Sequence, residues 1–210
     1  MNNHSNLQPY WQQLTAGYTT DQHFTNTTFQ DIIRHYSEPN RHYHNLSHIS
    51  RLLDLTQQYQ HLLADPDTLS FAVFFHDLIY DVHRTDNEAL SAAAAIRFLH
   101  CIRYPEALMQ KAATFINATK SHINDTANPD LDFFLDIDLS ILGEHPHTYQ
   151  LYTTQIRREY AVYPYETYNT GRKQVLQHLL SLPAIYKTAP FLQTHESQAR
   201  INIQTELSTL

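Results

Sequence analysis

Apolar residues recur every three to four positions through most of the chain, which is the period of an amphipathic helix. The strict apolar–polar alternation that marks a strand is nearly absent. The helical pattern covers residues 21–36, 45–63, 68–80, 86–101, 105–121, 131–142, 148–163, 165–182 and 191–207. We therefore expect an all-α fold, a compact single-domain bundle of about eight to ten helices over residues 1–210. Its chemical motifs fall in about 41–142, and the helices over 148–207 complete the bundle.

Local signals support several of these helix boundaries. Pro39 disfavours the helical conformation for the residue before it, which ends the first segment. Asp67 can cap the helix over 68–80, and Asp86 can cap the alanine-rich helix that follows. Gly143 suits the position just beyond a helix C-terminus.

Composition points to a soluble, cytoplasmic globular protein. The hydrophobic fraction of 42% in 210 residues is enough to build a core. No apolar run approaches the roughly 18 residues that span a bilayer, and the N-terminal residues lack the features of a signal peptide. Cys101 is the single cysteine, so it cannot form a disulfide within the chain. We expect it to be a buried structural thiol.

Charge and glycine content narrow the classes of function. The net charge is −7 and no run of Lys or Arg occurs, which argues against general nucleic-acid binding. With only three glycines, the chain has neither a Walker loop nor a dinucleotide-binding loop. A small anionic substrate held by a metal ion and a few arginines remains compatible with this composition.

Four short segments place ionisable residues where the surrounding pattern is apolar or helical. His44 and His48 lie four residues apart and share a helix face if the helix already includes His44. His76 and Asp77 follow the apolar run FAVFF, whereas Asp136 and Asp138 interrupt the apolar stretch LDIDLS. His122 ends a further helix.

Buried ionisable groups require partners, and one divalent cation would serve the histidines and carboxylates together. Such a cation lowers the pKa of its bound water and polarises a phosphoryl oxygen.

The order of these residues resembles the HD superfamily of metal-dependent phosphohydrolases, which is named for its His-Asp doublet. The family's metal set, H…HD…D, is matched here by His48, His76, Asp77 and Asp138. The chain looks most like the bacterial group of predicted HD phosphohydrolases. The matching segments, from about residue 41 to 202, are RHYHNLSHI, FFHDLIYD, DNEALSA, FLDIDLSILG, REYAVY, GR and ESQARIN.

Two segments, YHNLSH and DLS, also resemble the cyclic-nucleotide phosphodiesterases of the same superfamily. There the histidine of YHN protonates the leaving oxygen and the later histidine binds metal. The resemblance implies that His44 is a general acid and His48 a metal ligand. It also gives Asp138 the last ligand position, and Asp138 or Asp77 can orient the attacking water.

Three further residues have two interpretations each. His122 either binds a second ion or the substrate, with an alternative role as general acid, or only interacts with the dipole of the helix that it ends. Glu88 either contacts a second metal or its water, or favours the N-terminus of its helix. Asp136 either supports a ligand from outside the metal shell, which we favour, or accepts a hydrogen bond from a backbone amide.

Basic residues supply candidates for phosphate binding, because a guanidinium can grip phosphate oxygens with paired hydrogen bonds. A structural or solvated role is the alternative for each, and Arg200 can pair with Glu196 one helical turn earlier. The candidates are Arg41, Lys120, Arg172 and Arg200.

These observations lead to one principal functional hypothesis and two alternatives. The principal one is hydrolysis of a phosphate ester or anhydride of a small molecule such as a nucleotide. It requires one or two divalent ions among Mn, Fe, Ni, Mg and Zn, with no membrane partner, and it allows a homo-oligomer. The alternatives are a di-iron oxygenase that uses His122 and Glu88 as extra ligands, and an inactive HD-fold module that only binds.

Overall fold

The computed structural model describes residues 6–210, and over this range the protein is entirely helical. Eleven α-helices are joined by turns and short 3₁₀ segments, slightly more helices than the pattern predicts. The predicted all-α class is confirmed. The chain divides into two compact units, an N-terminal unit that ends at Phe134 and a C-terminal unit over Leu135–Leu210. The single domain inferred from the sequence stays a prediction.

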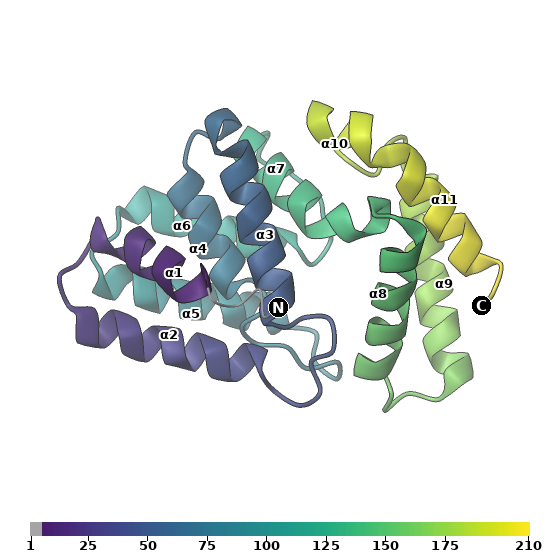
Figure 1. Ribbon diagram of the computed structural model, residues 1–210, viewed down its shortest axis with the longest axis horizontal. Helices are drawn as coiled ribbons and strands as arrows, with labels where there is room; N and C mark the ends of the chain where they lie inside the picture. Colours follow the sequence, from purple (N-terminus) through teal and green to yellow (C-terminus); the bar gives the residue numbers. More distant parts are fainter. Residues whose placement is uncertain (1–5) are drawn as a thin grey trace. The chain divides into compact units, whose positions relative to one another are not determined.

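The N-terminal unit contains six complete helices and the first part of a seventh (Figure 1). Their bounds are α1 (Leu7–Ala16), α2 (Gln22–Tyr36), α3 (Leu46–Tyr59), the 3₁₀ segment η2 (Gln60–Leu62), α4 (Pro66–Phe75), α5 (Asn87–Cys101), α6 (Glu106–Ala118) and α7 (Pro129–Asp138).

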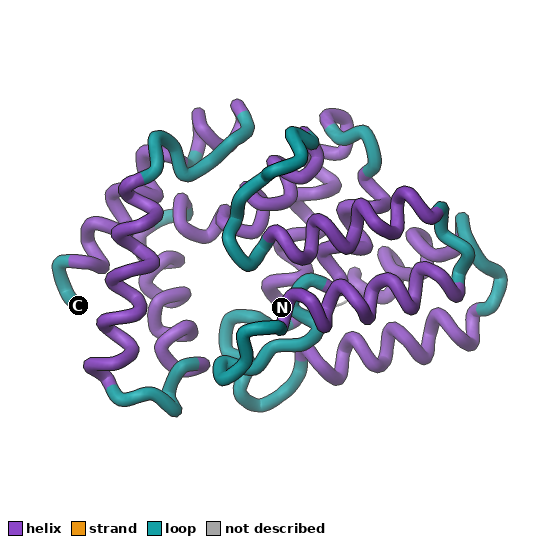
Figure 2. Tube along the Cα trace, turned by 180° about the vertical axis from the view of Figure 1, so that it is seen from behind, coloured by secondary structure: helices purple, strands orange, loops and turns teal. Residues whose placement is uncertain are grey.

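Helix α4 is the centre of the N-terminal unit. Every residue from Thr68 to Phe75 is buried, as expected for a helix that is apolar on all sides. It packs against α3, α5 and α6, and Figure 1 shows it among these helices. Residues at the C-terminal end of α4 are consequently enclosed by other helices. The view from behind shows helices joined by loops throughout the described residues (Figure 2).

Helix α1 contributes a large aromatic side chain to this core. The Trp11 side chain is fully buried, and its indole N–H donates to the Thr25 carbonyl at 3.0 Å. Its ring contacts Phe74 and Phe98, each at 4.9 Å between centroids. The sequence pattern does not predict α1, because this short segment has few apolar positions.

The C-terminal unit comprises the end of α7, the 3₁₀ segment η3 (Leu139–Gly143), α8 (Pro146–Glu159), α9 (Tyr165–Ser181), α10 (Ala189–Thr194) and α11 (Glu196–Leu207). Asn202 on α11 donates to the carbonyls of Leu142 and Glu144 at 2.8 Å, which fixes α11 against η3. Arg172 on α9 forms an ion pair with Glu206 on α11 at 2.8 Å, and Glu206 accepts a further hydrogen bond from Tyr149.

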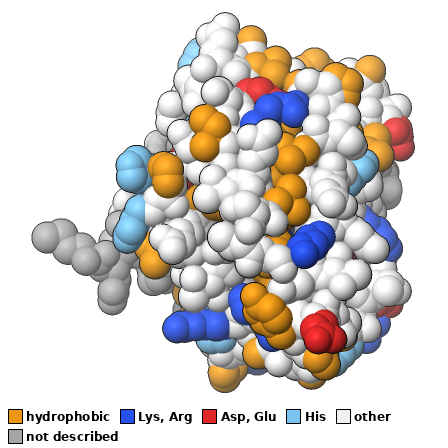
Figure 3. All heavy atoms as spheres, turned by 90° about the vertical axis from the view of Figure 1, so that its right-hand side faces the viewer, with side chains coloured by type: hydrophobic (Ala, Val, Ile, Leu, Met, Phe, Trp, Pro, Cys, Tyr) orange, Lys and Arg blue, Asp and Glu red, His pale blue; other side chains and the backbone are white. Residues whose placement is uncertain are grey.

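Several large apolar side chains of the C-terminal unit are exposed. They belong to α8, α9, α11 and the turn after α8, and Figure 3 shows apolar side chains among polar ones on this side of the molecule. The most exposed are Leu151, Val162, Tyr165, Val175 and Ile201.

Some predicted boundaries are wrong. Helix α4 ends at Phe75, whereas the pattern extends it to Tyr80. The segment 131–142 is α-helical only to Asp138 and then tightens into η3, and the helix predicted over 191–207 is interrupted at His195. Cys101 is exposed, so the prediction of a buried thiol is also wrong. Over residues 6–210, no helix has the length and apolar character that a bilayer crossing requires.

Candidate metal centre

His44 and His48 are placed by the start of α3. Asn45 is the N-cap: its backbone is extended and its side chain accepts a hydrogen bond from the Ser47 N–H at 2.8 Å. His48 therefore lies in the first turn of α3 and is buried, with 3% of its surface exposed. His44 precedes the cap, so the helix does not include it and the condition for the two histidines to share one helix face is not met.

His76 and Asp77 follow the last residue of α4. His76 is the C-cap residue, and its side chain is 1% exposed. Its Nδ1 lies 2.9 Å from the Val73 carbonyl oxygen. Because a carbonyl oxygen can only accept, Nδ1 carries a proton, and Nε2 is the nitrogen that faces the other side chains of the cluster. The end of the central helix thus fixes the orientation of His76.

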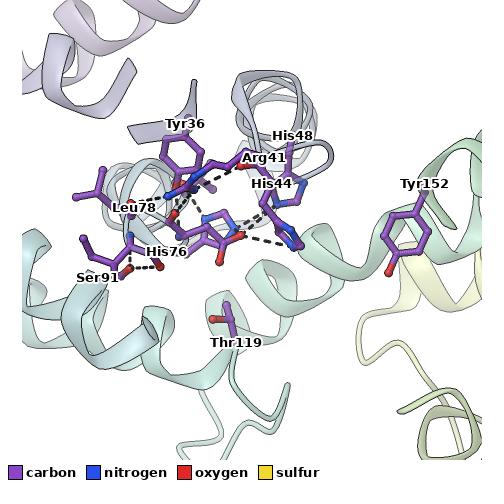
Figure 4. Close-up of polar contacts among 12 residues, drawn as sticks. Tyr36, Arg41, His44, His48, His76, Leu78, Ser91, Thr119 and Tyr152 are labelled. Carbon is purple, nitrogen blue, oxygen red and sulfur yellow. Dashed lines mark hydrogen bonds and ion pairs between the residues drawn. The ribbon is translucent and has the colours of Figure 1, made fainter. Parts of the chain in front are cut away.

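The side chains of His44, His48 and His76 converge (Figure 4), and Asp77 meets them there. His76 Nε2 lies 3.2 Å from His48 Nε2 and 3.1 Å from Asp77 Oδ2. The same carboxylate oxygen lies 3.9 Å from His44 Nε2 and 4.0 Å from His48 Nε2. Three imidazoles and one carboxylate therefore meet at one point of the N-terminal unit.

His76 Nε2 and the Asp77 carboxylate face each other at a distance that needs a proton or a cation between them. A lone pair that faces a carboxylate oxygen at 3.1 Å is otherwise repelled. A proton on His76 or on the Asp77 carboxyl, or a metal ion bound by both groups, would remove this repulsion.

The spacing of the donor atoms suits a metal ion. Ligand atoms about 2.1 Å from a cation lie roughly 3.0–3.4 Å apart in octahedral or tetrahedral geometry. The separations of 3.2 Å and 3.1 Å around His76 Nε2 fall in this range. The hydrogen bond from His76 Nδ1 to a backbone carbonyl is also the usual support of a metal-binding histidine.

Asp138 is the last residue of α7 and is half-buried. It belongs to the C-terminal unit, but the N-terminal part of the same helix lies in the N-terminal unit. There, the Phe134 ring meets the His76 ring edge-on, with 5.9 Å between centroids.

Asp136 makes the contacts that its alternative interpretation predicts, which are hydrogen bonds from backbone amides. Its buried carboxylate accepts hydrogen bonds from the backbone N–H groups of Lys187 and Thr188 and from the Thr188 hydroxyl, at 2.7–3.0 Å. Burial raises the pKa of Asp136 to about 6 even though these hydrogen bonds act to lower it. Asp136 thus holds the segment before α10, and its support of a metal ligand stays a prediction.

Glu88 and His122 lie at helix ends. Glu88 is half-buried in the first turn of α5, where its charge favours the helix dipole. His122 follows α6 in a left-handed conformation with φ of 54°, and its backbone N–H donates to the Ala118 carbonyl at 2.8 Å. Both interpretations of each residue stay predictions.

Two of the four basic candidates for phosphate binding have buried structural roles. The Arg41 side chain is fully buried and donates to Glu38 and to three backbone carbonyls. Arg172 is committed to Glu206. Direct contact of either guanidinium with a phosphate stays a prediction, and a phosphate would have to displace these buried contacts.

The other two candidates also bind protein groups. Arg200 pairs with Glu196 at 2.6 Å, the predicted alternative, and donates to the carbonyls of Leu180, Leu182 and Pro183. Lys120 is exposed and its Nζ donates to the Thr85 carbonyl at 2.5 Å. A substrate could displace only this exposed lysine contact at low cost.

Two tyrosines near the cluster carry a role that the sequence does not reveal. The Tyr36 hydroxyl accepts a hydrogen bond from the Asp77 backbone N–H at 3.1 Å. The Tyr80 ring lies against His44, with 4.4 Å between centroids and 30° between planes. From the sequence alone, tyrosines at these positions can equally well be core residues, so only the structure identifies these contacts.

No protein-family model matches this chain, and no curated protein or solved structure matches it either. The resemblance to the HD superfamily therefore depends on the quoted motifs alone.

Proposed function

We propose that this protein is a metal-dependent phosphohydrolase that acts on a small phosphate ester or anhydride, such as a nucleotide. The observation that carries the proposal is the environment of His76 Nε2. His76 Nε2, on a ring whose Nδ1 is held by the Val73 carbonyl, faces both His48 Nε2 and the Asp77 carboxylate at 3.1–3.2 Å. A divalent cation bound by all three groups removes the repulsion and suits the chemistry of nitrogen and oxygen donors.

We propose Asp138, the half-buried last residue of α7, as the fourth ligand, because the resemblance to the HD superfamily gives it this position.

The four proposed ligands leave coordination positions for water and substrate, as catalytic sites require. When bound, the cation supplies Lewis acidity and makes water a nucleophile near neutral pH. Asp77 or Asp138 accepts a hydrogen bond from the attacking water and orients it. His44 is less enclosed than His48 and is separated from Asp77 Oδ2 by 3.9 Å, which suits a residue that meets the substrate. His44 donates its proton to the leaving oxygen.

The proposed substrate is a small phosphorylated molecule, because the chain has no basic surface run for a nucleic acid. Its phosphate charge would be neutralised chiefly by the cation, since Arg41 and Arg172 are committed to the protein interior. We also propose a cytoplasmic location, because a chain with a single cysteine fits a reducing compartment.

The test combines metal analysis of the purified protein with phosphate release from a panel of nucleotides and phosphate esters. Each assay is run after dialysis against chelator and after addition of Mn²⁺, Fe²⁺, Ni²⁺, Mg²⁺ or Zn²⁺. The variants are Asp77→Ala and His76→Ala, and His61→Ala on the exposed segment after α3 is the matched control.

We expect wild-type and His61→Ala proteins to bind about one ion or more per chain and to release phosphate only with metal. Both cluster variants should lose bound metal and turnover. Normal activity in Asp77→Ala would contradict the ligand assignment. Bound iron with oxygen consumption and no phosphate release would favour the di-iron oxygenase instead.

A further inference from the structure

We propose that Arg41 is the positioning residue of the metal centre, and that it acts through the backbone of the His-Asp turn and through the Tyr80 ring. The inference rests on the proposed function, because it assigns Arg41 a role in holding the metal ligand Asp77 and the general acid His44. Arg41 does not touch the substrate or the metal in this proposal.

The Arg41 guanidinium binds the turn after α4 through backbone carbonyl oxygens. Its Nη1 donates to the Asp77 carbonyl at 2.5 Å, and its Nη2 donates to the Leu78 carbonyl at 2.9 Å. Nη1 also lies 3.4 Å from the His44 carbonyl. One planar guanidinium therefore ties two segments that are 33 residues apart in sequence, the segment before α3 and the turn after α4 (Figure 4).

The peptide groups of Asp77 are held on both sides. Tyr36 accepts the hydrogen bond of the Asp77 N–H at 3.1 Å, while Arg41 binds the Asp77 carbonyl. This fixes the backbone from which the Asp77 carboxylate projects. A carboxylate on an unsupported turn would be free to rotate away from His76.

Aromatic rings extend the network to His44. The Arg41 guanidinium lies over the Tyr36 ring at 5.0 Å and over the Tyr80 ring at 5.5 Å. Tyr80 in turn lies against the His44 ring at 4.4 Å. Cation–π attraction of this kind strengthens when the groups are removed from water, and the Arg41 side chain has no exposed surface.

A lysine cannot replace this arginine. Its single ammonium lacks the planar fork that reaches two neighbouring carbonyls and stacks on aromatic rings. Glu38 completes the arrangement from the surface, because its carboxylate accepts a hydrogen bond from Arg41 Nε at 3.0 Å and balances the buried charge.

The test measures Mn²⁺ binding by electron paramagnetic resonance and calorimetry in full-length protein. Arg41→Met should weaken Mn²⁺ binding about 10–100-fold, the usual effect of losing a group that supports a metal ligand. Arg41→Lys should not restore the affinity. Arg200→Met is the matched control, since Arg200 also binds one carboxylate and several carbonyls but lies in the C-terminal unit. It should bind Mn²⁺ as the wild type does.

A second readout does not depend on metal. In metal-free protein, the imidazole ¹H–¹⁵N signals of His44 and His76 should shift in Arg41→Met and stay unchanged in Arg200→Met, with the amide spectrum showing that both variants are folded. If wild-type protein binds none of the five ions tested for the proposed function, that function fails while these signals still test the positioning role. Unshifted imidazole signals, or unchanged Mn²⁺ affinity in Arg41→Met, would overturn it.

Discussion

Asp130 holds the first turn of α7 in the N-terminal unit, and replacing it with Asn tests how much a buried carboxylate contributes there. Its side chain is 3% exposed. It accepts hydrogen bonds from the backbone N–H groups of Ala64 and Asp65, each at 2.9 Å, and from Lys111 Nζ at 2.9 Å. Lys111 also binds the Asp65 carboxylate. Asp130 thus links α7 to α6 and to the start of α4.

Asp130→Asn keeps the shape of the side chain but offers only one acceptor oxygen. Its amide nitrogen would face a backbone N–H, and the Lys111 ammonium would lose one of two negative partners. Removing one member of a buried ion pair costs about 3–5 kcal/mol, and each charge-assisted hydrogen bond about 1.5–3 kcal/mol. Because Asp65 still balances Lys111, we expect the free energy of unfolding to fall by about 2–4 kcal/mol.

The assay is urea unfolding at pH 7, followed by circular dichroism. Asp132→Asn is the control, because Asp132 lies on the same turn but is half-buried and accepts from Asn124 at 2.9 Å rather than from backbone amides. We expect it to lower the free energy of unfolding by less than about 1 kcal/mol.

The stabilisation of the fold by the Asp130 carboxylate should decrease as the pH falls. Burial acts to raise its pKa, but the backbone N–H donors and the Lys111 ammonium outweigh burial and leave the pKa below its usual value. The carboxylate therefore stabilises the fold fully above its unfolded pKa of about 3.9, and this contribution is lost as the pH falls through the lower folded pKa. A difference from wild type below about 1 kcal/mol at pH 7, or one that persists undiminished at pH 2, would refute the reasoning.

Three further predictions concern single residues. His44→Ala should retain metal but lose rate, most strongly for substrates with poor leaving groups; an equal loss on activated aryl phosphates would argue against its role as general acid. Gly143→Ala should lower the free energy of unfolding by about 1–3 kcal/mol, because the added Cβ would lie 2.8 Å from the His195 carbonyl oxygen; thermal melting checks this, and an unchanged midpoint contradicts it. Arg172→Met should cost about 3–5 kcal/mol in urea unfolding by leaving the Glu206 charge buried without its partner, and a loss below about 1 kcal/mol would show that the pair is dispensable.

The sequence predicts the helical class and most helix positions because the apolar period is a local property. The start of α2 is predicted from Asp21, whose side chain accepts from the Phe24 N–H, and α5 begins one residue after Asp86 as expected. Helix ends that depend on tertiary packing are harder to predict from the sequence. Helix α4 stops at Phe75 although the apolar pattern continues, because the following residues turn toward Arg41 and Tyr36.

The candidate site, like the fold, is only partly predictable from the sequence. The sequence identifies His44, His48, His76 and Asp77 from their residue types and apolar context, and the structure brings these four together. The sequence does not distinguish arginines that bind carbonyls from arginines that are available to a phosphate, because this difference depends on partners remote in sequence.

The amino-acid sequence by itself thus determined the all-helical class and the residue types of the candidate cation site, since both follow from local periodicity and donor chemistry. Tertiary structure decided the contact of Tyr80 with His44 and the burial of Arg41. The physical reason is that hydrogen-bond direction and burial depend on which distant segments pack together around α4. No pattern along the sequence specifies which distant segments come into contact.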